Sequence, residues 1–224
     1  MKRELIITAD GSSSIYLPEW NESYHSQNGA IREAYHVFME MGLFYFASTH
    51  QPTQAINILE IGFGTGLNAF ISFLEAEKKQ FKINYTAVEA YPVSPAETGK
   101  LNYVQQLSAG KWEGVFREMH EISGEKFHAF PRGFRLKKER KLFQEISDTE
   151  KFDLLFFDAF GPEVQPELWT GEIFANMFQA LKKHGVLVTY SAKGSVRRAM
   201  QTAGFCVERL PGPPGKRHML RATK

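Results

Sequence analysis

The sequence predicts an α/β fold in which a mostly parallel, nucleotide-binding sheet ends in an antiparallel hairpin. Three observations predict it: an apolar run that leads into a glycine turn and a helix at 56–77, two later apolar runs that each end in an acidic residue at 83–89 and 153–158, and two final short runs joined by the rigid connection PGPPG at 211–215. Strand, glycine turn and helix form the first unit of sheets that bind nucleotides at the carboxyl ends of their strands.

A small N-terminal appendage is expected to precede this sheet. With 224 residues, the chain is one domain, or one domain with an addition. We expect residues 1–50 to form a hairpin and a lid or helix, and residues 51–224 to form the main domain. A turn at Asp10-Gly11 separates the two hairpin strands, and a helix follows Gly29. The polar loop before that helix is open to two interpretations, a helix cap or a lid over a ligand cleft.

The glycine turn reads Glu-x-Gly-x-Gly-x-Gly over residues 60–66. Glycine is needed where the backbone turns sharply and where a ligand approaches it closely. A dinucleotide fingerprint would place its third glycine at position 67, which is Leu67, so a nicotinamide dehydrogenase is disfavoured. The pattern resembles motif I of class I S-adenosylmethionine (SAM) methyltransferases, which have a Rossmann-like fold. The resemblance implies SAM as the cofactor, held by Glu60, Gly62, Phe63, Gly64, Thr65, Gly66 and Asn68.

The second strand, at 83–89, ends in Glu89, which we expect to bind the cofactor ribose together with the neighbouring Ala90. A carboxylate in this position accepts hydrogen bonds from both ribose hydroxyls. A helix is predicted over 92–107, irregular structure over 108–133, and a third strand at 134–136 with a helix near 141–146. The end of that third strand carries no aspartate, so the residue that contacts adenine is left unassigned.

The strand at 153–157 is followed by Asp158, at the edge of the sheet where ligands bind. A helix from Pro166 or Thr170 to Lys183 is expected next, then a strand at 186–190 and a helix at 193–202. The final strands at 205–210 and 218–222 form the antiparallel hairpin. No internal repeat and no second large domain is indicated.

Composition excludes several classes of protein. The single cysteine rules out an internal disulfide, and the seven histidines are scattered without ligand spacing, so we expect no metal. No apolar run is long enough for a membrane span and no signal peptide is evident, so a cytoplasmic location is expected. The net charge is −5 for residues 1–131 and +7 for residues 132–224. Such a basic part is typical either of nucleic-acid binding or of a solvated surface.

The segment Asp158-Ala159-Phe160-Gly161-Pro162 occupies the position of the Asp/Asn-Pro-Pro-Phe/Tyr box of amine methyltransferases. Together with Trp169, SAKGSVRR at 191–198, AGF at 203–205 and GKRHML at 215–220, it resembles the methyltransferase half of the MnmC family. These are bifunctional tRNA 5-methylaminomethyl-2-thiouridine biosynthesis proteins. The resemblance runs from about Tyr24 to the carboxyl terminus and is strongest over 152–219.

The resemblance implies SAM-dependent methylation of the aminomethyl group on the wobble uridine, position 34, of tRNA. The family's bifunctional members continue into an FAD-dependent oxidase, whereas this chain stops at Lys224. We therefore expect no FAD, and an acceptor that a separate enzyme supplies. The expected partner is the tRNA anticodon stem-loop, with the protein acting as a monomer.

Asp158 and Phe160 are the predicted catalytic residues. Asp158 is expected to orient the amine or the cofactor's ammonium group, and Phe160 to face the cationic centre or the uridine ring. Tyr24 and Trp169 are candidates for stacking on the base. The anticodon-stem phosphates are expected to contact a set of basic side chains, Lys193, Arg197, Arg198, Lys216 and Arg217.

Two other interpretations stay open. A SAM-dependent N-methyltransferase of a small amine explains the glycine turn, Glu89 and Asp158 equally well, and only the basic part of the chain and the family resemblance oppose it. A non-catalytic RNA-binding module on the same fold is opposed by the intact cofactor residues. Measured SAM affinity separates that module from both enzymes.

Overall fold

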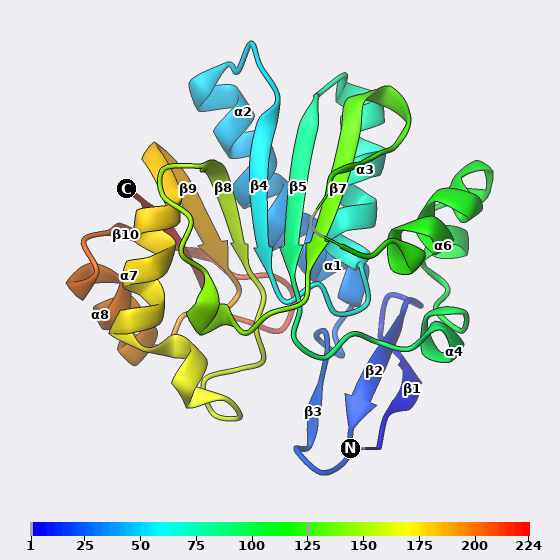
Figure 1. The fold of residues 1–224 in the computed structure, drawn as a ribbon. Coiled ribbons are helices and arrows are strands. Elements are labelled where there is room, and N and C mark those ends of the chain that lie inside the picture. The colour runs from blue at the N-terminus through cyan, green and yellow to red at the C-terminus, as the bar shows by residue number, and fades with distance from the viewer. Residues whose placement is uncertain (1, 125) are drawn as a thin grey trace.

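The computed structural model describes residues 2–124 and 126–224 and has the predicted α/β architecture (Figure 1). The main sheet has eight strands, and its five central strands are parallel. Two antiparallel strands close one edge as the predicted terminal hairpin. In spatial order the strands are β10 (Cys206–Pro211), β11 (His218–Thr223), β9 (Leu181–Thr189), β8 (Phe152–Phe157), β4 (Ile56–Ile61), β5 (Ile83–Val88), β7 (Phe134–Glu139) and β6 (His128–Ala129).

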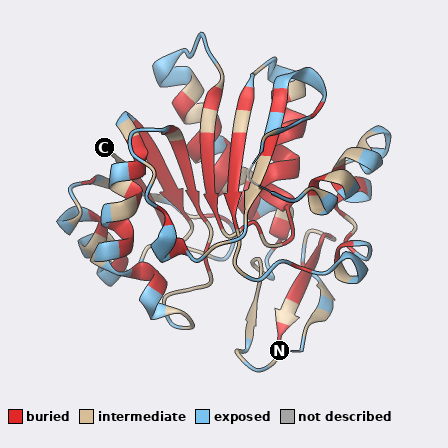
Figure 2. Ribbon diagram, viewed as in Figure 1, coloured by how far each residue is buried: buried red, intermediate tan, exposed pale blue. Residues whose placement is uncertain are grey.

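Helices cover both faces of this sheet, which is why its central strands are apolar on both sides. Ile58 packs into the core on one face and its neighbour Leu59 into the core on the other, and both are fully buried. Figure 2 shows the central strands as a buried layer between helices with exposed outer surfaces. The helices on the first face are α1 (Ala30–Ala34), η1 (Tyr35–Phe44), α2 (Tyr45–His50) and α3 (Leu67–Lys79), and those on the second are α7 (Gly171–Ala180) and α8 (Gly194–Thr202).

The predicted N-terminal hairpin is present as β1 (Glu4–Ile7) and β2 (Ser13–Leu17), and β3 (Glu22–Ser23) adds a third strand. This small sheet lies beyond the carboxyl ends of the central strands (Figure 1). The helix after Gly29 is continuous through α1, η1 and α2, but its middle ten residues have π-helical hydrogen bonding that periodicity does not predict. Because Val37 and Phe38 are buried against the main sheet, helix and sheet share one core. The division between residues 50 and 51 stays a prediction.

Two predictions for the segment between β5 and β7 are wrong. The helix expected over 92–107 is two single turns, α4 (Pro95–Thr98) and α5 (Tyr103–Gln106), separated by residues 99–102. The stretch 108–133, expected to be irregular, contains the amphipathic helix α6 (Glu113–Glu121), which buries Phe116 and Met119. The remaining short turns are η2 (Gly110–Trp112) and η3 (Pro131–Gly133).

Two further helix predictions differ from the structure. In place of a helix near 141–146 there is only the 3-10 turn η4 (Phe143–Glu145). The helix expected to reach Lys183 ends at Ala180, and the turn before it is η5 (Pro166–Trp169). Leu181 pairs with Phe152 as the first residue of β9 and is fully buried. Strand pairing therefore overrides the helical pattern in the three residues that follow Ala180.

Candidate functional site

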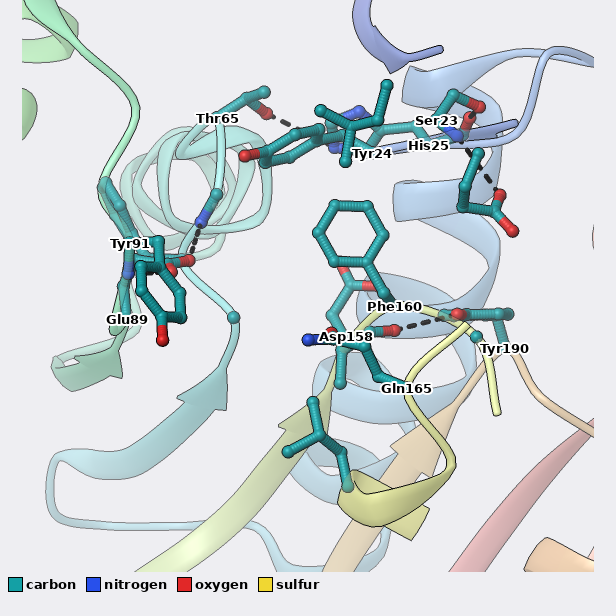
Figure 3. A pocket seen from close by; sticks show the side chains of 18 of the residues that line it. Ser23, Tyr24, His25, Thr65, Glu89, Tyr91, Asp158, Phe160, Gln165 and Tyr190 are labelled. Carbon is teal, nitrogen blue, oxygen red and sulfur yellow. Dashed lines mark hydrogen bonds between the residues drawn. The ribbon is translucent and has the colours of Figure 1, made fainter. Parts of the chain in front are cut away.

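A cavity of about 850 Å³ lies where the carboxyl ends of β4, β5 and β8 meet the N-terminal sheet. This volume lies within the range of about 300–1,000 Å³ that small-molecule sites occupy. Each of the three predicted groups, cofactor-binding, catalytic and substrate-binding, contributes residues to its lining, as Figure 3 shows for Glu89, Asp158, Phe160 and Tyr24. The structure thus brings the main sequence motifs to one place.

The glycine turn forms the floor of the cavity between β4 and α3. Gly62, Gly64 and Gly66 all have positive φ angles, of 90°, 49° and 73°, a backbone region that favours glycine. A Cβ atom on Gly62 would lie 2.6 Å from the backbone oxygen of Asp158. The turn is therefore packed directly against the residue that follows β8, and a side chain at Gly62 would push the two apart.

Glu89 follows β5 and faces the same cavity. Its carboxylate accepts hydrogen bonds from the backbone N–H groups of Gly64, at 3.0 Å, and Tyr91, at 2.8 Å. These contacts fix the carboxylate between the glycine turn and the loop after β5. That position agrees with the predicted ribose contact, which stays a prediction.

Two of the predicted cofactor residues, Glu60 and Gly66, do not line the cavity. Glu60 is fully buried beneath the turn, and neither of its carboxyl oxygens has a hydrogen-bond partner among the described residues. Burial, followed by the nearby charge of Asp158, raises the pKa of Glu60 well above its usual range. Burial therefore favours the protonated form of this carboxyl group, which lies beneath the turn. The other predicted cofactor residues, Phe63, Thr65, Asn68 and Ala90 among them, line the cavity.

Asp158 lies at the centre of the site. Its Oδ2 atom accepts a hydrogen bond of 2.8 Å from Nδ2 of Asn68, at the start of α3. Burial raises the pKa of Asp158 to about 7, and the nearby charge of Glu33 acts in the same direction. A carboxyl group with this pKa exchanges a proton near neutral pH, as a general base requires.

An aromatic wall stands beside Asp158. The ring of Phe160 makes edge contacts with the rings of Trp20, at 5.5 Å between centroids, and Tyr24, at 5.0 Å. Trp20 and Tyr24 belong to the N-terminal segment, and Figure 3 shows Tyr24 beside Phe160, so this segment covers the loop that follows β8. Burial raises the pKa of Tyr24 to about 12, which keeps its phenol neutral.

The loop before α1 lies over the glycine turn, as its lid interpretation requires. The His25 ring lies between two hydroxyl groups. Its Nδ1 atom is 3.1 Å from Ser14 Oγ, and its Nε2 atom is 3.3 Å from Thr65 Oγ1. Burial lowers the pKa of His25 to about 4, so the ring is neutral. The N–H groups that begin the helix bond instead to Asp10 and Thr8 of the hairpin. The cap is therefore supplied by the hairpin.

Several lining residues carry no sequence signal that would have identified them. Leu142, Phe143 and Gln144 follow β7 and line the cavity with Tyr91. They lie in the loop after the third strand, where the sequence offers no acidic residue for adenine. Glu139 itself is held by ion pairs with Lys137 and Lys141. Glu33 and Tyr190, from α1 and from the end of β9, also line the cavity.

The predicted substrate residues fall into two groups. Tyr24 and Lys216 line the cavity, whereas Trp169 and the other basic residues do not. Trp169 is 5% exposed, packs on Phe157, and donates its indole N–H to the backbone oxygen of Phe160 at 2.8 Å. The position of Trp169 contradicts a stacking role for it, because a buried ring offers no face to a base. Lys193 pairs with the exposed Glu163. The remaining predicted phosphate contacts lie on α8 or on the β10–β11 loop and are Arg197, Arg198 and Arg217.

The cavity is acidic. Its lining includes two basic side chains, Arg3 and Lys216, and the basic part of the chain contributes only the second of them. An excess of carboxylates favours a cationic ligand, such as an alkylammonium group or a sulfonium. The lining carboxylates are Glu22, Glu33, Glu89, Glu97, Asp158 and Glu167.

The residues present fit the cofactor that the glycine motif implies. The turn offers a cradle that a Cβ atom would fill, and Glu89 offers a carboxylate beside it. Asn68 Oδ1 is buried without a hydrogen-bond partner among the described residues, although its Nδ2 is bonded to Asp158. A buried acceptor of this kind suits a ligand that donates a hydrogen bond.

Within residues 2–124 and 126–224, no cluster of three or more His, Cys, Asp or Glu side chains is arranged to hold a metal ion. No helix in these two ranges is both long enough and apolar enough to cross a membrane.

Comparisons with known proteins identify methyltransferases as relatives of this chain. Residues 134–224 match the family model described as S-adenosyl-L-methionine-dependent methyltransferase. A bifunctional MnmC protein of Leptospira interrogans is 30% identical over 211 residues, which is 90% of this chain and 32% of that protein. The MnmC protein of Nitrosospira multiformis is 28% identical over 94% of this chain and 35% of its own length. The chain thus spans about a third of the length of the curated relatives it matches.

Solved structures give the same result for the fold. MNMC2 from Aquifex aeolicus superposes with a TM-score of 0.76 and 26% identity, covering 99% of this chain and 70% of that one. Spermidine synthase from Thermotoga maritima has a TM-score of 0.55 at 14% identity, covering 95% of this chain and 69% of that one, and shares the fold alone. The predicted Rossmann-like methyltransferase fold and the resemblance to the MnmC methyltransferase half are both confirmed.

Proposed function

We propose that this chain, an MnmC-like methyltransferase domain, methylates the aminomethyl group of 5-aminomethyl(-2-thio)uridine at position 34 of tRNA. The observation that carries the proposal is the position of Asp158. This half-buried carboxyl group lies between the glycine cradle and the aromatic wall, in a cavity whose acidic lining suits an alkylammonium group. The similarity to MnmC proteins over 90% or more of the chain supports tRNA as the substrate class.

SAM, when bound, supplies an electrophilic methyl group that leaves sulfur as it bonds to the acceptor nitrogen. The acceptor must be neutral to react, yet a primary alkyl amine has a pKa of roughly 10. Asp158 accepts a hydrogen bond from the amine and takes up its proton, because its raised pKa makes it a better base than an exposed carboxylate. Asn68 orients Asp158 through their 2.8 Å hydrogen bond.

The aromatic wall limits water and favours the cationic reactants. A cation against an aromatic face gains about 0.5–2 kcal/mol, and the ring of Phe160 is fixed by its contacts with Trp20 and Tyr24. Tyr24, which lies at the cavity surface, is the candidate for stacking on the uridine base.

Nucleoside mass spectrometry tests the function. The protein is incubated with SAM and two batches of tRNA, one with aminomethyl and one with carboxymethylaminomethyl uridine at position 34. We expect a gain of one methyl group on the first batch alone. SAM binding without methylation of either batch would overturn the tRNA assignment, and methylation of a free alkyl amine would then favour the small-amine enzyme.

We also propose that Arg197 and Arg198, on α8, bind phosphates of the anticodon stem. Replacing both with Ala should weaken tRNA binding and make the slope of log K against log[salt] shallower by about 1–2, since each phosphate contact contributes about 0.7–0.9. Filter binding at several salt concentrations measures this slope. The matched control is Lys78→Ala with Lys79→Ala, which removes the same charge from the last turn of α3. Equal slopes for the two double variants would show that α8 does not contact the tRNA phosphates.

A further inference from the structure

One wall of the cavity contains an ion pair that joins three separate parts of the chain. Glu33, on α1, is 7% exposed, and its Oε1 atom lies 2.5 Å from Nζ of Lys216, in the loop between β10 and β11. The same ammonium group lies 3.8 Å from the centre of the Tyr190 ring, at the end of β9. All three side chains line the cavity. A lysine held between a carboxylate and an aromatic face is not free to bind a phosphate of tRNA.

This group is connected to the loop that carries the predicted catalytic residues. The Tyr190 hydroxyl donates a 2.8 Å hydrogen bond to the backbone oxygen of Ala159, which lies between Asp158 and Phe160 (Figure 3). Glu33 is fixed on its other side, because its Oε2 atom accepts a 2.8 Å hydrogen bond from the N–H of Ser26. A displacement of Lys216 would therefore disturb both Glu33 and the Tyr190 hydroxyl that holds the loop after β8.

The pair also controls the charge that Asp158 experiences. The negative charge of Glu33 raises the pKa of Asp158, and the positive charge of Lys216 lowers it. The Asn68 amide also acts on Asp158 and favours its charged form. Burial and the charge of Asp158 raise the pKa of the Glu60 carboxyl and of the Tyr190 and Tyr85 phenols, which favours their protonated forms. Burial has the largest effect on Asp158, and Glu33 and Lys216 are two charges of opposite sign that act on it in addition.

We propose that Glu33 and Lys216 are positioning residues for the methyl acceptor: Lys216 compensates the charge of Glu33, so that Asp158 is the carboxylate that holds the acceptor amine. The inference rests on the proposed function, because it assigns these residues to the acceptor side of that reaction. It also replaces the phosphate-binding role that the sequence suggests for Lys216.

The test uses direct titration of Asp158 in the full chain, without substrate. Protein labelled with ¹³C at aspartate carboxyl carbons is titrated by NMR, and the Asp158 signal is assigned from its loss in Asp158→Asn. Lys216→Met should raise the midpoint of Asp158 by about one pH unit, because Glu33 is then uncompensated. Glu33→Gln should lower it by a similar amount, because Lys216 is then unpaired. Lys216→Arg keeps the charge and should titrate as the wild type does.

The kinetic readout follows the same signs. The acid limb of kcat/KM against pH should move to higher pH in Lys216→Met and to lower pH in Glu33→Gln. The double variant Glu33→Gln with Lys216→Met leaves no unpaired buried charge and should restore the wild-type midpoint. Lys182→Met is the matched control, because it removes the lysine partner of Asp153 at the opposite end of β8. It should leave the Asp158 midpoint unchanged.

Failure of this inference is distinguishable from failure of the proposed function. Methyl transfer to tRNA, combined with equal Asp158 midpoints in wild type, Lys216→Met and Glu33→Gln, would overturn the inference alone. Shifts of the same sign in both single variants would also overturn it. Opposite shifts in a protein that methylates no tRNA would overturn the proposed function and leave the charge coupling of Lys216, Glu33 and Asp158 established.

Discussion

Replacing Asp158 with Asn is expected to lower kcat for methyl transfer by about 10²–10⁴-fold, the usual range for loss of a general base. The amide is nearly isosteric, so its oxygen can still accept the hydrogen bond from Asn68. What is lost is the charge and the capacity to take up the amine's proton. Single-turnover transfer at saturating SAM and tRNA measures the chemical step.

The pH dependence adds a second readout for Asp158. Because its pKa is raised to about 7, the base is protonated below neutral pH, and kcat/KM of the wild type should rise through pH 7. The Asn variant should lack this rise in kcat/KM. The folded-state pKa also lies above the unfolded value of about 3.9, so wild-type stability should fall as pH rises from about 4 to 7. The Asn variant should therefore have a higher Tm than the wild type at pH 8.

Calorimetric SAM binding distinguishes two roles for this carboxylate. A low kcat with unchanged SAM affinity in the variant would show that Asp158 acts on the acceptor amine. A matching loss of SAM affinity would show that Asp158 holds the cofactor's ammonium group instead. Wild-type kcat together with wild-type SAM affinity in Asp158→Asn would exclude both roles.

The residues that could be predicted from the sequence are those with a local signal. Gly62, Glu89 and Asp158 each come directly after an apolar strand, and parallel strands bring their carboxyl ends to one edge of the sheet. Their order along the chain is therefore sufficient to place them around one cavity. The fold is predicted by the same signals, because periodicity and strand-ending residues are properties of short segments.

The residues that could not be predicted depend on contacts between distant segments. Glu33 and Lys216 are 183 positions apart, and nothing near either one indicates the other. The sequence predicts that Trp169 binds the substrate, but it lies in the core. A large aromatic residue close to a motif suits either position, and only the contact with Phe157 in the structure shows which one it takes. Helix α6 could not be predicted for a similar reason, because it is stabilised by the core contacts of Phe116 and Met119.

Replacing Gly62 with Ala is expected to weaken SAM binding by about ten- to a hundredfold. The φ angle of 90° is strained for any residue with a side chain, at a cost of roughly 1–2 kcal/mol, and a factor of ten in affinity corresponds to 1.4 kcal/mol. The new Cβ atom would also lie 2.6 Å from the backbone oxygen of Asp158, so the turn and the loop that follows β8 must separate. Isothermal titration calorimetry measures the affinity, and thermal unfolding measures the accompanying loss of stability.

Gly114→Ala is the matched control for this substitution. Gly114 lies in α6 with no atom within 4 Å of the added Cβ, so alanine should stabilise the helix by about 0.4–1 kcal/mol and leave SAM affinity unchanged. Equal SAM affinities in the two variants would mean that the turn after β4 is not the cofactor cradle. Weaker binding in Gly62→Ala alone would assign the cradle to this turn, because both variants carry the same added methyl group and only one of them lies against Asp158.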